Sequence, residues 1–311
     1  MTIVRLEGDQ PVPSALRGGV IALGNFDGFH LGHQAVVGRA IALAKERGAP
    51  ALVATFDPHP VRYFRPDAEP FRLTTLDQRL ALFAAAGAEA MLVFRFDGIM
   101  AAVSAEEFIT DWLIGRAGAS GVVTGQDFTF GKGRGGNTDI LRERGTALGL
   151  TVEAVVPVNQ GDEIISSSRI RDAIKAGDCE TATKLLSRPF TIAGRVQHGD
   201  KVGRTIGFPT ANVALNGYLR PRYGIYAVWV RLADGRVLNG AANIGIRPTF
   251  DPPKELLEVF VFDFEGDLYG QMLEVELHSF IRPEAKFDSL DDLMAQMAWD
   301  CDTARIRLSG Q

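Results

Sequence analysis

The N-terminal half of the chain alternates short apolar runs with longer amphipathic stretches, and this alternation restricts the fold more than any other feature. The runs are continuous rather than alternating in polarity, which is typical of strands buried on both faces. They span residues 19–23, 51–56, 91–96, 121–125 and 150–158. Between them, apolar residues recur at three- and four-residue spacing, which indicates helices. The sequence therefore predicts an α/β, Rossmann-like domain built on a parallel, doubly wound sheet.

The second half of the chain has a different pattern, which begins after about Ser187. Its apolar runs are shorter and more β-like, and turn signals such as Asp-Gly dipeptides separate them. Such spacing is typical of an antiparallel barrel or sandwich, and we expect a barrel. One amphipathic helix follows, with Asp288 or Ser289 as its N-cap. The expected domains are therefore 1–186, with the parallel sheet, and 187–311, with the β-barrel and the C-terminal helix.

Polar residues mark the expected starts of three helices in the first domain. Thr74, Ser104 and Thr138 each stand at the start of an amphipathic stretch. A side-chain oxygen at such a position accepts a hydrogen bond from a backbone N–H of the first turn. We therefore expect these three residues to be N-caps.

Composition and charge narrow the class of protein. The chain has 311 residues, a net charge of −5 and no long basic run, so we expect two domains and no nucleic-acid partner. The N-terminal stretch lacks the pattern of a secretory signal, and no apolar stretch reaches the roughly 18 residues of a membrane helix. Cys179 and Cys301 make no CxxC pair, which argues against a disulfide framework and a structural zinc site. These features predict a cytoplasmic protein without a membrane partner.

The segment 24–33, with the sequence GNFDGFHLGH, joins the first expected strand to the first expected helix. Its glycines let the backbone approach a ligand, and the helix start supplies unpaired N–H groups and partial positive charge. His30 and His33 are three residues apart, so both imidazoles face one side of the first turn. This arrangement suits nucleotidyl transfer, in which negative charge develops on phosphate oxygens. The other candidate ATP-binding residues of the loop are Gly24, Asn25, Phe26 and Asp27.

Two other interpretations of the histidine pair stay open, because short motifs also match by chance. Both histidines can begin a helix without having any function. A zinc site is a weaker alternative, because it needs a third ligand and no cysteine cluster supplies one.

Three further segments of the first domain carry candidate ligand-binding residues. His59 stands between two prolines after the second expected strand, at the edge where open α/β sheets bind ligands, although it can be an incidental loop residue. After the fourth expected strand, Phe128 offers a ring for stacking and Arg134 a charge for phosphate, without forming a Walker A loop. Ser167 and Arg169 begin an expected helix that can bind a triphosphate, unless it is an ordinary capped surface helix.

A glycine-rich segment in the second domain suggests a further nucleotide site. Gly203, Gly207 and Phe208 can form a flap over a nucleotide. Thr210 and Asn212 are two residues apart and share one face of a strand, so their side-chain oxygens can approach one Mg²⁺ ion. The alternative is a glycine-rich hairpin without a ligand.

One carboxylate stands inside an expected apolar strand of the second domain. Glu258 interrupts a run of Leu, Val and Phe, where a charge is costly unless it is solvated or functional. By the two-residue period of a strand it shares a face with Phe260 and Phe262, which weakens the interpretation as a solvated face. Glu258 is therefore a candidate base for phosphoryl transfer to a hydroxyl group.

In this order, the segments resemble those of the bacterial bifunctional riboflavin kinase/FAD synthetase family, over almost the whole chain. The resemblance is carried by GNFDGFHLGH, TFDPHP, RLTTLDQR, GQDFTFGKGRGG, ISSSRIR, GRTIGFPTAN, YGIYAV, NIGIRPTF, LEVFVFDFEGDLYG and FIRPEAKFDSLDDLMAQM. Two residues depart from the family pattern. Phe260 stands where a histidine is frequent, and Pro283 stands where an acidic residue is more usual. The flavin contacts near Pro283 are therefore not implied by the resemblance.

The resemblance implies two reactions in sequence. The barrel would phosphorylate riboflavin with Mg-ATP to give FMN, and the N-terminal domain would transfer AMP from a second ATP to FMN, giving FAD and pyrophosphate. His30 and His33 match the family's nucleotidyl-transfer histidines, and Glu258 matches its catalytic carboxylate. The other matches are Asn25 and Asp27 in the ATP loop, Asp127 beside the flavin and phosphate site, Ser167 and Arg169 in the second ATP motif, and Thr210 and Asn212 as the magnesium and ATP pair.

Three alternatives keep part of this interpretation. The N-terminal domain can act on FMN while the barrel only binds flavin, which the set Thr210, Asn212 and Glu258 argues against. A non-catalytic flavin carrier would leave two phosphate-binding loops unexplained. The same fold can also serve another acceptor, such as pantetheine phosphate or glycerol phosphate. The expected partners are riboflavin, FMN and ATP, and the sequence leaves the oligomeric state open between a monomer and a weak homo-oligomer.

Overall fold

The computed structural model describes residues 3–198, 208–247 and 254–310. The contacts between residues in space divide the chain into two compact units. The first consists of Met1–Glu69 and Thr75–Ser166, and the second of Pro70–Thr74 and Ser167–Gln311. Within the described ranges, no helix has both the length and the apolar character that crossing a membrane requires.

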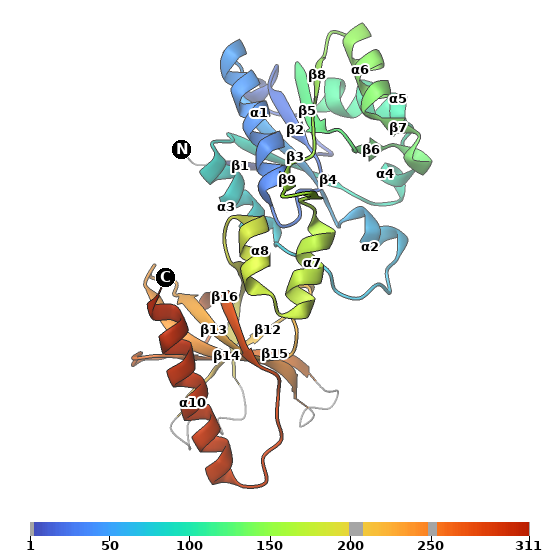
Figure 1. The fold of residues 1–311 in the computed structure, drawn as a ribbon. Coiled ribbons are helices and arrows are strands. Elements are labelled where there is room, and N and C mark those ends of the chain that lie inside the picture. The colour runs from blue at the N-terminus through green and yellow to red at the C-terminus, as the bar shows by residue number, and fades with distance from the viewer. Residues whose placement is uncertain (1–2, 199–207, 248–253, 311) are drawn as a thin grey trace. The chain divides into compact units, whose positions relative to one another are not determined.

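A six-stranded parallel sheet forms the centre of the first unit (Figure 1). Its strands, in spatial order, are β1 (Val4–Glu7), β4 (Ala90–Arg95), β3 (Ala51–Asp57), β2 (Val20–Leu23), β5 (Gly121–Gly125) and β8 (Thr151–Val155). The chain runs outward from β2 through β3 to β4, and then crosses to the other side of β2 to form β5. The order of the strands therefore reverses between β2 and β5, which makes this the switch point of the sheet.

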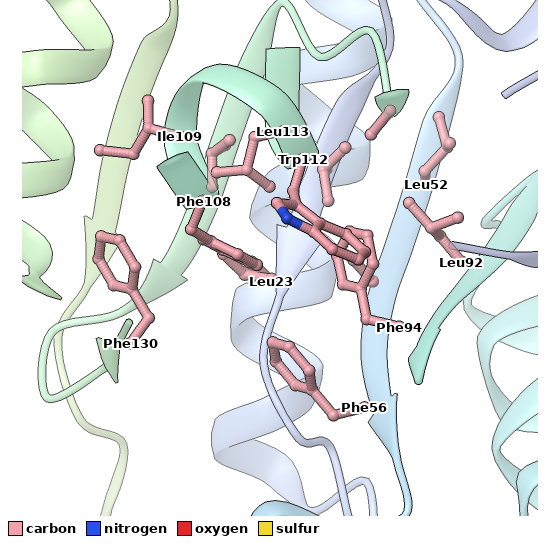
Figure 2. Packing of buried hydrophobic residues seen from close by; sticks show 14 of the residues in the cluster. Leu23, Leu52, Phe56, Leu92, Phe94, Phe108, Ile109, Trp112, Leu113 and Phe130 are labelled. Atoms are coloured by element: carbon pink, nitrogen blue, oxygen red, sulfur yellow. The ribbon is translucent and has the colours of Figure 1, made fainter. Parts of the chain in front are cut away.

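Helices cover both faces of this sheet, as the continuous apolar runs predict. Alternate residues of β2 enter two separate cores, with Val20 and Ala22 in one and Ile21 and Leu23 in the other. The first core includes α1 (Leu31–Arg47) and α3 (Leu76–Ala86). The second includes α4 (Gly98–Ala102), the π-helical segment Phe108–Arg116 and α6 (Thr138–Ala147). Aromatic rings fill much of the second core, and Phe94 packs edge-on against Trp112 at 5.7 Å (Figure 2).

The helix starts partly confirm the expected caps. Ser104 caps α5 (Ala105–Glu107) in a capping box with Glu107, as predicted. The predictions of Thr74 and Thr138 are wrong by one residue, because Thr75 caps α3 and Asn137 caps α6.

The smaller elements of the first unit are the 3-10 turns Ser14–Leu16 and Lys132–Arg134, the short helix α2 (Pro60–Phe64), and the hairpins of β6 (Thr129–Phe130) with β7 (Gly136–Asn137) and β9 (Asn159–Gln160) with β10 (Glu163–Ile164).

The second unit is built around a closed antiparallel barrel, which confirms the predicted fold class. Its strands, in spatial order, are β11 (Phe190–Gln197), β12 (Ala211–Ala214), β15 (Lys254–Val261), β14 (Val237–Arg247), β13 (Gly224–Arg231) and β16 (Met272–Arg282). The C-terminal helix α10 (Leu290–Ser309) is capped by Ser289. It packs Ala304 and Leu308 against the outside of the barrel, beside Phe262.

Two helices precede the first strand of the barrel in the chain. Contacts group α7 (Ser167–Ala176) and α8 (Cys179–Leu186) with the second unit. A backbone hydrogen bond from Arg222 to the carbonyl oxygen of Ile174 contributes to this grouping. The boundary between domains 1–186 and 187–311 remains a prediction.

Two candidate active sites

Two loops of the first unit leave the carboxyl ends of the strands at the switch point. One joins β2 to α1 and contains the sequence GNFDGFHLGH, and the other follows β5. Open α/β sheets bind ligands in the crevice at such a point, because the two loops diverge there. Most residues that the sequence predicted for adenylyl transfer lie on these two loops.

The β2–α1 loop is held in place by two buried rings. Phe26 and Phe29 have φ values of 49° and 43°, which L-residues with large side chains rarely adopt. Both rings are buried and pack edge-on against Phe83 of α3, at 5.9 Å and 5.1 Å. Burial of the rings offsets the backbone strain and fixes the path of the loop. The side chain of Phe26 belongs to this core, so its backbone is the part that can meet a nucleotide.

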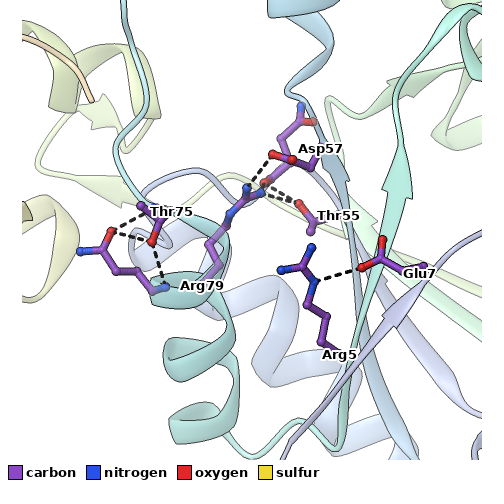
Figure 3. A network of polar contacts seen from close by, with 8 residues as sticks. Arg5, Glu7, Thr55, Asp57, Thr75 and Arg79 are labelled. Atoms are coloured by element: carbon purple, nitrogen blue, oxygen red, sulfur yellow. Dashed lines mark hydrogen bonds and ion pairs between the residues drawn. The ribbon is translucent and has the colours of Figure 1, made fainter. Parts of the chain in front are cut away.

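Arg79 of α3 ties this loop to the end of β3 (Figure 3). Its Nη1 donates to the backbone oxygen of Asn25 at 3.0 Å and to Oγ1 of Thr55 at 2.8 Å. Thr55 Oγ1 also donates to the Asn25 oxygen at 2.8 Å, and Arg79 Nη2 lies 3.8 Å from a carboxylate oxygen of Asp57. Arg79 was not among the residues predicted from the sequence. The sequence feature that could have indicated it is a charged residue on the core-facing side of a helix, three residues after Leu76 and four before Phe83.

His30 and His33 stack on each other at the start of α1. Their ring centroids are 3.6 Å apart and their planes differ by 20°. His30 is the N-cap, and its Nδ1 accepts a hydrogen bond from the backbone N–H of His33 at 3.3 Å. Because Nδ1 accepts, the neutral imidazole of His30 carries its proton on Nε2. A side chain on Gly32 would approach the His30 ring to 3.1 Å, so glycine allows the ring to lie against this turn.

His59 begins α2, and exposed aromatic rings follow it. Its Nδ1 accepts from the backbone N–H of Val61 at 3.2 Å. Tyr63 and Phe64 are 41% and 65% exposed, and each lies edge-on to Phe96, which follows β4, at 5.7 Å and 5.8 Å. These three rings form an aromatic cluster after the carboxyl ends of β3 and β4. His59 was predicted from the sequence, and the aromatic cluster was not.

The loop after β5 carries the remaining candidates of the first unit. Asp127 and Arg134 are exposed, and Phe128 is half-buried. Phe128 stacks on Phe130 at 5.8 Å, and Phe130 is buried in the core. Phe128 is therefore partly engaged within its own loop.

The candidates Ser167 and Arg169 belong to the second unit, where they lie in the first turn of α7. Their role in ATP binding stays a prediction. In the same unit, Arg171 of α7 donates from Nε to the backbone oxygen of Phe71 at 2.8 Å.

A polar row crosses three neighbouring strands of the barrel. Asn212 of β12 pairs in register with Glu258 of β15, and Glu258 pairs with Asn243 of β14. Directly paired residues of a sheet share one face, so the carboxylate stands between two amides. In the described part of the chain, Oδ1 of Asn212 and Oδ1 of Asn243 are buried and have no hydrogen-bond partner. Asn212 and Glu258 were predicted from the sequence, and Asn243 was not.

Two further predicted residues, Thr210 and Phe208, lie close to this row. Thr210 lies directly before β12, and Phe208 packs edge-on against Phe260 at 5.4 Å. Gly203 and Gly207 lie outside the described residues. Pro283 is exposed, and its backbone oxygen accepts a hydrogen bond from Arg282 at 2.9 Å.

The oxygen atoms at this polar row are of the kind that the predicted magnesium ion requires. Among the residues that the structure describes, no three His, Cys, Asp or Glu side chains form a metal-binding group. The unsatisfied oxygen of Asn212 and the nearby hydroxyl of Thr210 are neutral oxygen ligands of the kind that Mg²⁺ accepts together with substrate phosphates. The residues therefore fit the ion.

The parallel sheet with its histidine-bearing helix start, and the barrel with its carboxylate between two amides, define a two-domain transferase that acts on nucleotide phosphates. The family model for FAD synthetase matches residues 12–169, and that for riboflavin kinase matches residues 186–308. The chain belongs to the bifunctional riboflavin kinase/FMN adenylyltransferase family. It is an enzyme with both activities and uses ATP and flavins as substrates.

Known proteins resemble the chain over nearly its full length. The bifunctional riboflavin kinase/FMN adenylyltransferase of Escherichia coli (strain K12) is 41% identical, over 93% of this chain and 92% of the relative. The one from Bacillus subtilis (strain 168) is 42% identical, over 90% of each. A crystal structure from Streptococcus pneumoniae, described as a macrolide-efflux protein, is 32% identical with a TM-score of 0.86, covering 97% of this chain and 99% of the other. The predicted family is confirmed.

Proposed function

We propose that the two reactions use the two residue sets described above, with adenylyl transfer in the first unit and riboflavin phosphorylation in the second. The observation that carries this assignment is the stacked pair of His30 and His33, which lies at a helix start beside the switch point of the sheet. The polar row around Glu258 supports the second half of the assignment.

In adenylyl transfer, an oxygen of the FMN phosphate attacks the α-phosphorus of ATP. The new P–O bond joins FMN to AMP, the bond to the β-phosphate breaks, and pyrophosphate leaves with the electron pair. His30, His33 and the N–H groups of the first turn of α1 stabilise the charge that develops on the phosphate oxygens. Asn25 and Asp27, with the backbone of Gly24 and Phe26, line the nucleotide side of the loop. Ser167 and Arg169, in the first turn of α7, are proposed to bind ATP phosphates.

The flavin ring of FMN requires a flat, apolar surface near these groups. The aromatic cluster of Tyr63, Phe64 and Phe96 follows β3 and β4, and two of its rings, Tyr63 and Phe64, are exposed, so we assign the isoalloxazine to it. His59 begins the helix that carries two of these rings, and it would contact the same ligand. Asp127, Phe128 and Arg134 would bind the FMN phosphate and ribityl chain from the loop after β5.

In the kinase reaction, Glu258 accepts the proton of the ribityl 5′-hydroxyl as its oxygen attacks the γ-phosphorus of ATP. The bond to the β-phosphate then breaks, and ADP leaves with the electron pair. Thr210 and Asn212 would hold magnesium, which neutralises phosphate charge when it is bound. Gly203, Gly207 and Phe208 would cover the nucleotide.

Two properties of the whole chain complete the proposal. We assign the protein to the cytoplasm, because both reactions consume ATP and because Cys179 and Cys301 are free thiols. All groups proposed for catalysis come from one chain, so a monomer or a weak homo-oligomer is sufficient for activity.

The test is a product assay on the purified protein. Incubation with riboflavin, ATP and magnesium is expected to give FMN first and FAD later, as followed by chromatography. A parallel incubation with EDTA in place of magnesium should give neither product. Absence of both products from the complete mixture would refute the assigned function, and full activity with EDTA would refute the role of the ion.

A further inference from the structure

Asn243 occupies a position in the barrel that the kinase chemistry above does not use. It lies in register with Glu258 on the opposite side from Asn212, so the three side chains follow one another across β12, β15 and β14. Neighbouring strands are about 4.8 Å apart, so each amide is one strand away from the carboxylate.

The amide oxygen of Asn243 lacks a donor within the described chain. It is buried, and no N–H or O–H group of the described residues reaches it. A buried polar atom without a partner destabilises the fold, so such atoms in native proteins usually bind water, an ion or a ligand. Glu258 cannot supply the missing proton when it acts as a base, because an ionised carboxylate only accepts hydrogen bonds.

The order of the row assigns different partners to its two amides. Attack on the γ-phosphorus requires the acceptor oxygen to lie between the base and the phosphate, with the leaving group on the far side. If Asn212 holds the metal and nucleotide, the carbon chain that carries the attacking hydroxyl must approach Glu258 from another direction. The side of the row that remains is that of Asn243.

We infer that Asn243 binds the acceptor, with its amide oxygen accepting a hydrogen bond from a hydroxyl of the substrate's polyol chain. This inference rests on the proposed kinase site. Asn243 is thus a residue that positions the acceptor beside the base, and it contributes to selection of a polyhydroxyl substrate. Asn212 serves the opposite substrate, the nucleotide with its metal.

The test compares KM values for the two substrates in the full-length protein. Asn243→Ala should raise KM for riboflavin about tenfold to a hundredfold, because one buried hydrogen bond is lost. KM for Mg-ATP and the affinity for Mg-ATP in calorimetry should stay within about twofold of the parent. Asn239→Ala is the matched control, because Asn239 lies on the same strand and is exposed.

A second variant separates binding from folding. Asn243→Leu keeps the approximate volume and removes both polar atoms, so the thermal stability of the barrel should be unchanged or higher. Its KM for riboflavin should nevertheless rise as in the alanine variant. An unchanged riboflavin KM in both variants, or a rise in KM for Mg-ATP alone, would overturn the inference while the parent still makes FMN. Failure of the parent to make FMN would instead overturn the proposed function.

Discussion

Arg79 Nη1 lies 3.0 Å from the backbone oxygen of Asn25, so a buried guanidinium on α3 holds the first turn of the nucleotide loop. The same nitrogen reaches Thr55 at 2.8 Å, which joins the loop to the end of β3. The loop thus depends on a side chain far away in the sequence. Transfer reactions are sensitive to such placement, because small displacements of the reacting groups lower the rate strongly.

Arg79→Met should therefore reduce adenylyl transfer without affecting the kinase. The substitution keeps the aliphatic packing and removes the donors to Asn25 and Thr55, so that only the Thr55 hydroxyl still holds the Asn25 oxygen. We expect kcat/KM for conversion of FMN to FAD to fall by about tenfold or more. Riboflavin phosphorylation, which depends on the second unit, should keep its rate in the same preparation.

Arg5→Ala provides the control for a general effect of charge removal. Arg5 forms an exposed ion pair with Glu7 at 3.2 Å, and exposed pairs contribute little (Figure 3). Equal losses of adenylyl transfer in Arg5→Ala and Arg79→Met would contradict the positioning role of Arg79.

Phe64→Ala should weaken the binding of FMN in the first unit. Phe64 is 65% exposed and borders Phe96, so its removal takes away stacking surface without opening a core cavity. A ring contact of this kind corresponds to a rise of about threefold to tenfold in KM for FMN. Steady-state kinetics with FMN as the varied substrate measures this rise. Ile99→Ala is the control, since Ile99 is 73% exposed and lies outside the ring cluster, and an equal effect there would refute the flavin assignment.

Asp300→Ala should destabilise the second unit. Asp300 of α10 accepts two hydrogen bonds from Arg282 of β16, at 2.8 Å and 2.7 Å, and its side chain is 5% exposed. Removing one partner of a buried pair leaves the other charge uncompensated, which costs about 3–5 kcal/mol. Denaturant unfolding followed by tryptophan fluorescence measures the loss. Asp263→Ala is the control, because its pair with Arg305 is exposed and should matter little.

Alkaline pH should destabilise the second unit through groups that burial keeps protonated. Burial raises the pKa of the Cys179 thiol from 9.0 to about 12, and burial also raises the pKa of Tyr226. The unfolded chain releases the thiol proton near pH 9 while the folded chain retains it, so stability should fall as pH rises from about 9 to about 12. Unfolding at a series of pH values measures this slope, and Cys179→Ala should reduce it.

The thiol itself gives an independent measurement. A pKa of about 12 instead of 9.0 means about a thousandfold less thiolate on Cys179 at pH 8, so alkylation by iodoacetamide should be slow until the protein unfolds. Alkylation of the native protein at the rate of the unfolded chain would contradict the burial of this residue.

The sequence predicted the central strands and most helices, because continuous apolar runs and amphipathic stretches reflect burial directly. The strand β1 was not predicted, because Val4–Glu7 is short, largely exposed and half charged. Two caps were placed one residue off, because Thr74 and Thr75, or Asn137 and Thr138, are adjacent residues that can both cap.

The candidate sites were predictable only where function needs a recognisable local pattern. The histidine pair and Glu258 stand out from their neighbours in the chain. Arg79 and Asn243 do not, because their partners come from elements distant in sequence and only the folded structure brings them together. A charged or amide residue whose role depends on such contacts is therefore difficult to recognise from a single sequence.

The most direct test of the account separates the two activities in one polypeptide. Glu258→Gln should lower FMN production from riboflavin by about a hundredfold or more, while added FMN is still converted to FAD at the parent rate. The double variant His30→Ala, His33→Ala should show the reverse, with FMN formed and no FAD. If Glu258→Gln makes FMN at the parent rate, or the double histidine variant makes FAD at the parent rate, the assignment of the two reactions to these sites is contradicted.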